Sequence, residues 1–244
     1  MRIILSPAKK MRYDENGPAY RDLPVFLSDA EKIKASLKEK SFSELKALWA
    51  CNEKITEQNI ERLSSMDLRE KLAPAILSYD GIAYQYMAPT VFETEMLCYV
   101  QEHLRILSGF YGILKPMDGV TAYRLEMQAK LALCGAKNLY DYWGDRLYRE
   151  LRDSSGIIVN LASKEYSKCI EKYCVLRTAI SPAIFLKSKR RSLYKRECTV
   201  RWLAEKWSVL WRKTGLRSRR QSSISPSWDT IFSRTYLPRR SMFM

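Results

Sequence analysis

Apolar side chains recur along this chain in two patterns, as short unbroken runs and as longer segments with an apolar residue every three or four positions. The unbroken runs predict buried strands at residues 2–6, 157–161 and 175–184. The periodic segments predict helices near residues 28–40, 41–60, 68–77, 90–108, 138–152 and 163–173. Because helices interleaved with short apolar strands are typical of mixed sheets, we expect an α/β (mixed α+β) fold with short central strands surrounded by helices.

Capping motifs mark where several of these helices begin. Ser28, Ser41 and Thr90 each stand three residues before a glutamate, the S/T-x-x-E capping box in which side chains and backbone exchange hydrogen bonds. Asn138 precedes another amphipathic segment, and asparagine is a preferred N-cap. We therefore expect helices to begin at these four residues, the second of them about twenty residues long.

The middle of the chain holds the densest set of structural signals. Ser108-Gly109 is expected to end the helix that begins at Thr90, because glycine takes the left-handed conformation that a helix end needs. A short aromatic and branched run, Phe110–Leu114, comes next. Lys115–Gly119 predicts a turn, since its proline fixes φ and its glycine permits positive φ. Tyr123–Met127 alternates polar and apolar residues, which predicts a strand with one charged face.

Five motifs in a fixed order carry a resemblance to a known family. They are Ser6-Pro7-Ala8-Lys9, Tyr79-Asp80-Gly81, the run from His103 to Met127, Asn138–Asp145 and Val159–Tyr166. Over residues 1–184 the chain resembles the YaaA peroxide stress protein family. The resemblance implies a cytoplasmic bacterial protein associated with hydrogen peroxide stress, limitation of free intracellular iron, and DNA binding.

Basic residues that match the family lie at the ends of predicted elements or in the hairpin: Lys9, Arg105, Lys115, Arg124 and Lys164. If they converge, they form a cleft suited to phosphate, because lysine and arginine give charge-assisted hydrogen bonds to its oxygens. The other residues expected to line this cleft are Ser6, Gly109, Tyr111, Gly112, Tyr123 and Glu126. We expect phosphate contacts to DNA without sequence specificity, made by a monomer.

The glycine-framed bend Gly109-Phe110-Tyr111-Gly112 follows the predicted helix. In this context it loosely resembles the hairpin of a helix-hairpin-helix element, whose backbone amides hold DNA phosphates without reading bases. The DNA association that the family resemblance implies strengthens this interpretation.

An enzyme that acts on a small phosphorylated or nucleotide-like substrate in the same cleft is the alternative function. Ser6 beside Lys9 suggests a serine–lysine pair, and carboxylates for acid–base work stand at Asp80, Glu126, Asp141 and Asp145. Strand termination, helix capping and salt bridges explain the same residues more simply. The chain has no Walker, Rossmann or nucleophile-elbow motif. We therefore assign no catalytic residue and no cofactor, and we expect non-enzymatic action.

Composition narrows the remaining possibilities. One histidine and six cysteines without a C-x-x-C pair argue against a zinc site, so we predict no metal. The longest apolar runs are too short for a membrane span or a signal peptide, which predicts a cytoplasmic protein. The formal net charge is +15, but residues 185–244 alone carry +13 and the rest only +2. The excess charge therefore belongs to the end of the chain.

The chain changes character at about Phe185. We predict a core domain at residues 1–184 and, at 185–244, an irregular basic tail that contains four of the six tryptophans. A disordered arm and a nucleic-acid-binding extension are two explanations. A third comes from the genetic code: permitted codons for Glu197–Ile224, read in a shifted frame, give K-x-A-R-G followed by a helical pattern, which the family resemblance predicts here. We hypothesise a frameshift near residues 184–190.

Overall fold

The computed structural model describes residues 1–14, 17–174 and 179–182. The chain divides into two units, and every described residue belongs to the first, Met1–Val209. The predicted tail and the proposed frameshift lie outside the described residues. The boundary at residue 184 therefore stays a prediction.

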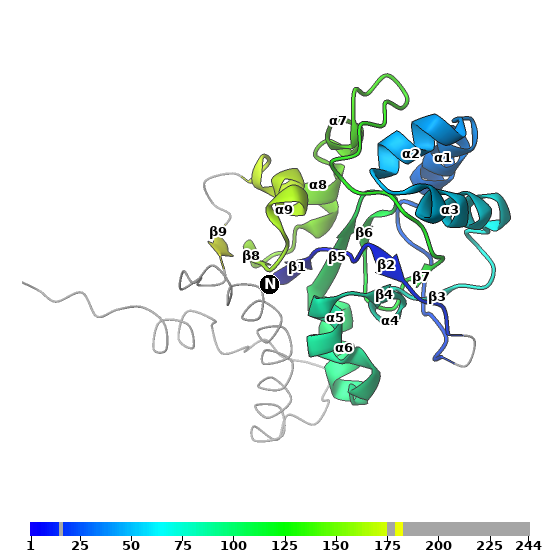
Figure 1. The fold of residues 1–244 in the computed structure, drawn as a ribbon. Helices are drawn as coiled ribbons and strands as arrows, with labels where there is room; N and C mark the ends of the chain where they lie inside the picture. The colour runs from blue at the N-terminus through cyan, green and yellow to red at the C-terminus, as the bar shows by residue number, and fades with distance from the viewer. Residues whose placement is uncertain (15–16, 175–178, 183–244) are drawn as a thin grey trace, which may run out of the picture. The chain divides into compact units, whose positions relative to one another are not determined.

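A five-stranded sheet forms the centre of the described unit (Figure 1). Its order is β6-β5-β1-β8-β9, and the strands are β1 (Arg2–Leu5), β5 (Leu104–Ser108), β6 (Gly112–Leu114), β8 (Ile157–Asn160) and β9 (Ala179–Pro182). All neighbours pair in parallel except β5 and β6, which are antiparallel. Parallel strands are covered on both faces and read as continuous apolar runs. Ile3, Ile4 and Leu5 of the central strand are accordingly all buried.

Two short strand pairs lie outside this sheet. β2 (Lys10–Met11) pairs with β4 (Tyr79–Asp80), and β3 (Ala73–Pro74) pairs with β7 (Gly119–Val120), both antiparallel. The first pair holds the segment that follows β1 against the Tyr79-Asp80-Gly81 motif. Gly81 is required there, because a Cβ would lie 2.8 Å from that of Ala8.

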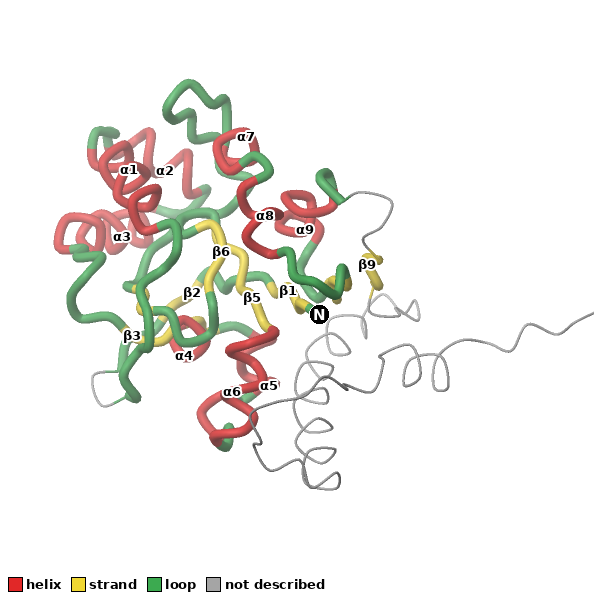
Figure 2. Tube along the Cα trace, turned by 180° about the vertical axis from the view of Figure 1, so that it is seen from behind, coloured by secondary structure: helices red, strands yellow, loops and turns green. Residues whose placement is uncertain are grey.

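Helices cover the sheet in separate groups. They are α1 (Leu27–Lys38), α2 (Phe42–Trp49), α3 (Glu53–Ser65), α4 (Ala75–Ser78), α5 (Ile82–Met87), the 3-10 helix η1 (Pro89–Val91), α6 (Thr94–His103), α7 (Leu139–Trp143), α8 (Arg146–Leu151) and α9 (Lys164–Glu171). In both views α1, α2 and α3 pack together, α8 and α9 lie side by side, and α5 and α6 lie apart from them (Figures 1 and 2). The predicted mixed α/β class is confirmed.

Several predicted helix boundaries are wrong. The helix predicted from Ser41 does begin there with a complete capping box, but it ends at Trp49 because Ala50 turns left-handed with φ 45°. Asn52 then caps a second helix, α3, by accepting a hydrogen bond from the backbone of Ile55. Ser28 does not cap α1, because that helix already begins one residue earlier, at Leu27. Most of the helix predicted at 68–77 is absent, since β3 and the single turn α4 occupy its second half.

The largest correction concerns the helix predicted from Thr90 to Ser108. Thr90 belongs to η1, α6 spans Thr94–His103, and the next five residues form β5. All five residues of β5 are buried, and the strand pairs with β1 on one side and β6 on the other. Leu104 continues the apolar spacing of α6 by coincidence, and pairing within the sheet overrides that local pattern.

The predictions for the end of the described unit hold better. Asn138 caps α7 as expected, but the predicted single helix is interrupted at Gly144, where φ is 53°, before α8 begins. The strand near 157–161 and the helix near 163–173 are confirmed as β8 and α9. Of the strand predicted at 175–184, residues Ala179–Pro182 form β9. Within the described part of the chain, no helix has the length and apolar character needed to cross a membrane.

Candidate functional site

The candidate site lies past the carboxyl ends of β1 and β8, where open α/β sheets place their ligands. Ser6 ties the two strand ends together. Its Oγ accepts a hydrogen bond from the backbone N–H of Ser163 at 2.7 Å and donates to the Ser163 hydroxyl at 3.2 Å. Its carbonyl accepts a hydrogen bond from the Tyr84 hydroxyl at 2.9 Å. These bonds give Ser6 a structural role in joining the two strand ends.

Two cations share one carboxylate at this edge. Lys9 Nζ lies 2.9 Å from Glu126 Oε1, and Arg124 Nη2 lies 3.2 Å from the same oxygen. The Lys9 side chain is 65% exposed, whereas those of Arg124 and Glu126 are 16% and 18% exposed. The buried Nε of Arg124 has no hydrogen-bond partner among the described residues. We call Lys9, Arg124 and Glu126 the edge cluster.

An extended segment supplies two members of the edge cluster. Tyr123, Leu125 and Met127 are buried, and Arg124 and Glu126 between them are half-buried, so the predicted alternation is confirmed. The segment does not join a sheet, and the predicted strand is wrong in that respect. The bend after β5 holds it closely: a Cβ at Gly109 would lie 2.8 Å from the carbonyl oxygen of Leu125.

The helix α9 adds charge beside the edge cluster. Glu165 Oε1 accepts a hydrogen bond from the backbone N–H of Gln128 at 3.2 Å, and burial raises the pKa of Glu165. Glu126 raises the pKa of Glu165 further, and Lys9 lowers it, which places all three groups in one electrostatic neighbourhood. Lys164 is 75% exposed and pairs with Glu171 of the same helix at 2.8 Å.

A buried layer of hydroxyl groups lies behind the extended segment. The Tyr123 hydroxyl is 2.8 Å from that of Tyr79 and 2.6 Å from Ser108 Oγ, and burial raises the pKa of Tyr123 to about 12. The sequence pattern pointed to Tyr123 but not to its two partners. In the sequence analysis Ser108 was used only as a signal for the end of a helix, and Tyr79 only as part of the Tyr79-Asp80-Gly81 motif.

The bend at residues 109–112 differs from the one expected. It connects the strands β5 and β6, so the helix-hairpin-like element is wrong. The backbone N–H groups of Phe110 and Tyr111 donate to Ser108 Oγ at 3.1 and 2.9 Å, and both side chains are fully buried. Because these amides have internal partners, they are not available to a phosphate. Gly112 has φ 74°, and a Cβ there would meet the Trp143 ring at 2.8 Å.

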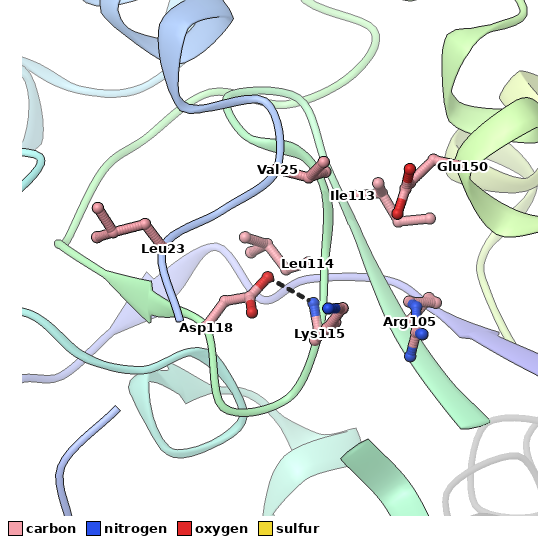
Figure 3. Close-up of a pocket in the computed structure, with 8 residues that line it drawn as sticks. All are labelled: Leu23, Val25, Arg105, Ile113, Leu114, Lys115, Asp118 and Glu150. Atoms are coloured by element: carbon pink, nitrogen blue, oxygen red, sulfur yellow. Dashed lines mark hydrogen bonds between the residues drawn. The ribbon is translucent and has the colours of Figure 1, made fainter. Parts of the chain in front are cut away.

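Arg105 and Lys115 do not join the edge cluster. Arg105 donates to the carbonyls of Gln101 and Leu104, and burial, together with the charge of Arg2 at the amino end of β1, lowers the pKa of Arg105 to about 10. It lines a hollow together with Lys115 (Figure 3). The five predicted basic residues therefore do not converge on one cleft. The structure joins Lys9 with Arg124, places Lys164 on α9, and puts the other two elsewhere.

The acidic residues weighed for an enzyme have ordinary partners. Asp80 pairs with Lys10 at 2.8 Å and accepts a hydrogen bond from Gln85, while Asp145 pairs with Arg149. Asp141 lies in the first turn of α7, where its backbone N–H donates to the Asn138 cap. Among the residues that the structure describes, no three His, Cys, Asp or Glu side chains lie together in a way that could hold a metal ion.

Comparison with known proteins identifies relatives of this chain. A family model described as "Peroxide stress protein YaaA" matches residues 1–199. A UPF0246 protein of Agathobacter rectalis is 62% identical over 71% of this chain and 70% of its own length. A UPF0246 protein of Lachnoclostridium phytofermentans is 54% identical over 76% of this chain and 72% of its own. A UPF0246 protein of Lactiplantibacillus plantarum is 46% identical over 84% of this chain and 86% of its own length.

Proposed function

Because the chain belongs to the YaaA peroxide stress protein family, we propose that it protects DNA during peroxide stress by binding its phosphate backbone through the edge cluster. It acts in the cytoplasm as a monomer, and its action limits free intracellular iron. The contacts are electrostatic and do not read base sequence.

The observation that carries the proposal is the incomplete pairing of the two cations. One carboxylate oxygen of Glu126 serves both Lys9 and Arg124, so these three groups by themselves carry one excess positive charge, beside the carboxyl of Glu165. The Nε of Arg124 lacks a partner, and most of the Lys9 side chain is exposed. A phosphate oxygen can bond the exposed Lys9 ammonium directly and adds a second negative charge to the cluster, and such charge-assisted bonds are about twice as strong as neutral ones.

Two other exposed cations stand next to residues of this neighbourhood in the sequence. Lys10 follows Lys9 and is 78% exposed, and Lys164 on α9 is 75% exposed. Each is held only by a surface ion pair, and such pairs contribute roughly 0–1 kcal/mol. Their ammonium groups can therefore exchange a carboxylate for a phosphate at little cost. Duplex DNA presents phosphates at regular spacing, which suits several cations that do not form a closed pocket.

Replacing both cluster cations tests the proposal. The Lys9→Ala plus Arg124→Ala variant of the full chain is expected to bind duplex DNA about tenfold or more weakly, as measured by fluorescence anisotropy at fixed salt. The matched control is Lys54→Ala plus Arg62→Ala, which removes two exposed cations from α3. Both variants keep the +13 of residues 185–244, so non-specific attraction by those residues cancels. Equal affinity of the two variants would contradict the proposal.

Glu126 gives a test of opposite sign. It competes with phosphate for Lys9 and Arg124, so Glu126→Gln is expected to strengthen DNA binding severalfold. Weaker binding would show that Glu126 orients the cations and does not compete with DNA.

The enzymatic alternative has a test of its own. It would be favoured by a small phosphorylated molecule that co-purifies stoichiometrically with the parent chain and is absent from the double alanine variant. Chelatable iron, measured in peroxide-treated cells with and without the protein, tests the effect on iron.

A further inference from the structure

A second carboxyl group, that of Glu165, stands beside the edge cluster and controls its net charge. The cluster itself holds two cations, Lys9 and Arg124, and one carboxylate, Glu126. With Glu165 ionised, the four groups together carry no net charge. With Glu165 protonated, they carry one positive charge. The charge available to a phosphate at this edge therefore depends on a single proton.

Two hydrogen bonds fix Glu165 in this position. The backbone N–H of Ser163 donates to Ser6 Oγ at 2.7 Å, which holds the start of α9 against the end of β1, three residues before Lys9. On the other side, Glu165 Oε1 accepts a hydrogen bond from the backbone N–H of Gln128 at 3.2 Å, two residues beyond the carboxylate of the cluster. The carboxyl is thus tied to both segments that build the edge cluster.

Glu165 is the member of the carboxyl pair that has no cation of its own. Glu126 lies 2.9 Å from Lys9 Nζ and 3.2 Å from Arg124 Nη2. In the described part of the chain, no ion pair within 4.0 Å reaches the half-buried Glu165. Burial raises the pKa of Glu165 above its ordinary 4.5, and the charge of Glu126 raises it further, whereas Lys9 lowers it. Another negative charge nearby disfavours the ionised form still more.

The hydroxyl and thiol groups that face Glu165 keep their protons in the neutral pH range. Tyr140 of α7 and Cys169 of α9 interact with its charge, and burial raises the pKa of both to about 12. Burial also raises the pKa of Tyr166, the next residue along α9. Between pH 5 and pH 8 these three groups therefore stay neutral, and Glu165 is placed to take up the proton.

We propose that Glu165 couples DNA binding to a proton, which its carboxyl takes up from the solvent as a backbone phosphate approaches Lys9. This inference rests on the proposed DNA site and adds a residue that controls it. Ionised Glu165 cancels the charge that attracts the phosphate, and protonation restores that charge. The two ligands raise each other's affinity by the same factor, as linkage requires. DNA is therefore bound more tightly as the pH falls.

The pH dependence of DNA affinity tests this proposal. Fluorescence anisotropy of the full chain with a labelled duplex, at fixed salt, is expected to show about three to ten times higher affinity at pH 5 than at pH 8. Glu165→Gln keeps an oxygen that can accept the Gln128 bond, and it is expected to bind more tightly than the parent at pH 8 and to change less with pH. Asp118, whose pKa burial raises to about 7, is present in both proteins, so its titration cancels. Equal pH profiles of parent and variant would overturn the proposal.

The protons taken up on binding can also be counted. Isothermal titration with the same duplex at pH 6, in two buffers of different ionisation enthalpy, is expected to show proton uptake by the parent and less uptake by Glu165→Gln. Equal uptake would place the proton on another group and overturn the assignment. The control Glu57→Gln removes an exposed carboxylate of α3 and is expected to keep the pH profile of the parent. A control that alters the profile as much as Glu165→Gln would assign the effect to overall charge and overturn the proposal.

Failure of this inference is distinguishable from failure of the proposed function. If Lys9→Ala plus Arg124→Ala binds DNA as tightly as its matched control, the DNA site itself is removed. If that variant binds weakly while the parent and Glu165→Gln share one pH profile, the DNA site stands and only the role of Glu165 is overturned.

Discussion

The buried carboxyl of Asp118 makes the stability of this protein depend on pH in an unusual direction. The side chain is 3% exposed, and desolvation raises its pKa from an ordinary 3.8 to about 7. The folded state therefore binds the proton more tightly than the unfolded chain does. Its contribution to stability is fully present below about pH 4 and is lost as the pH rises through 7. Most buried carboxylates that form ion pairs behave in the opposite way.

The size of the effect follows from the difference in pKa. Each unit corresponds to about 1.36 kcal/mol, so a rise from 3.8 to about 7 amounts to about 4 kcal/mol. Asp118→Asn removes the titrating group and keeps an oxygen that can accept the hydrogen bond from the Lys115 backbone. The variant is therefore expected to be more stable than the parent at pH 8, by up to about 4 kcal/mol, and to lose most of that advantage at pH 4.

Urea unfolding of both proteins from pH 4 to pH 8 measures this difference. Groups that do not interact with Asp118 titrate equally in the two proteins, so the change with pH of the gap in the free energy of unfolding reports mainly on this carboxyl. Asp145→Asn, which removes an exposed carboxylate paired with Arg149, is the control and is expected to change stability by roughly 1 kcal/mol or less. A gap that is constant with pH, or that narrows toward pH 8, would refute the reasoning.

Three further substitutions probe the packing of the fold. Tyr123→Phe removes the hydroxyl that bonds both Tyr79 and Ser108 in the buried layer and is expected to cost about 1–3 kcal/mol in urea unfolding; an unchanged midpoint would contradict the buried network. Gly112→Ala combines positive φ with a 2.8 Å approach to Trp143 and is expected to lower Tm, at a cost of about 1–3 kcal/mol; a stabilised variant would argue against the bend. Asp153, whose pKa is lowered to about 2 by the N-terminal ammonium group among its partners, contributes stability that is present above about pH 4 and lost toward pH 2. Asp153→Asn should lose about 1 kcal/mol at pH 6 and less at pH 2, and an equal loss at both would contradict the pairing.

The fold class was predictable because the strongest sequence signals were local. The unbroken apolar run at Ile3–Leu5 and the one at the start of β8 form adjacent parallel strands of the sheet. The caps at Ser41 and Asn138 begin the helices that they predict. Side-chain caps act over three residues, so they remain visible without knowledge of the tertiary structure.

The errors arose where long-range contacts decide the conformation. Leu104–Ser108 keeps the apolar spacing of the preceding helix, yet hydrogen bonding to two strands makes it β5. That change moves Arg105 to the start of a strand, toward Arg2, and away from Lys9. It also converts the glycine-framed bend into a buried β-turn. This one misassigned element explains both the wrong hairpin and the separation of Arg105 from the edge cluster.

The pairing of Lys9 with Arg124 could be predicted only in part. The alternation at Tyr123–Met127 correctly placed Arg124 and Glu126 on one face of the segment. The 114 residues between Lys9 and Arg124 gave no local signal that Glu126 would join them. Their contact depends on the packing of an extended segment against the end of β1, a tertiary arrangement that no periodicity encodes. The frameshift near residues 184–190 stays a prediction, and the coding DNA decides it.

The salt dependence of DNA binding tests the central claim most directly, because it counts phosphate contacts. If Lys9 and Arg124 each neutralise one phosphate, their removal reduces the slope of log K against log salt by about 2, since each contact contributes about 0.9. The measurement compares the parent chain with the double alanine variant between about 50 and 200 mM salt. A slope that falls by about 2 is the predicted result. A slope that stays the same would show that these two cations do not contact DNA.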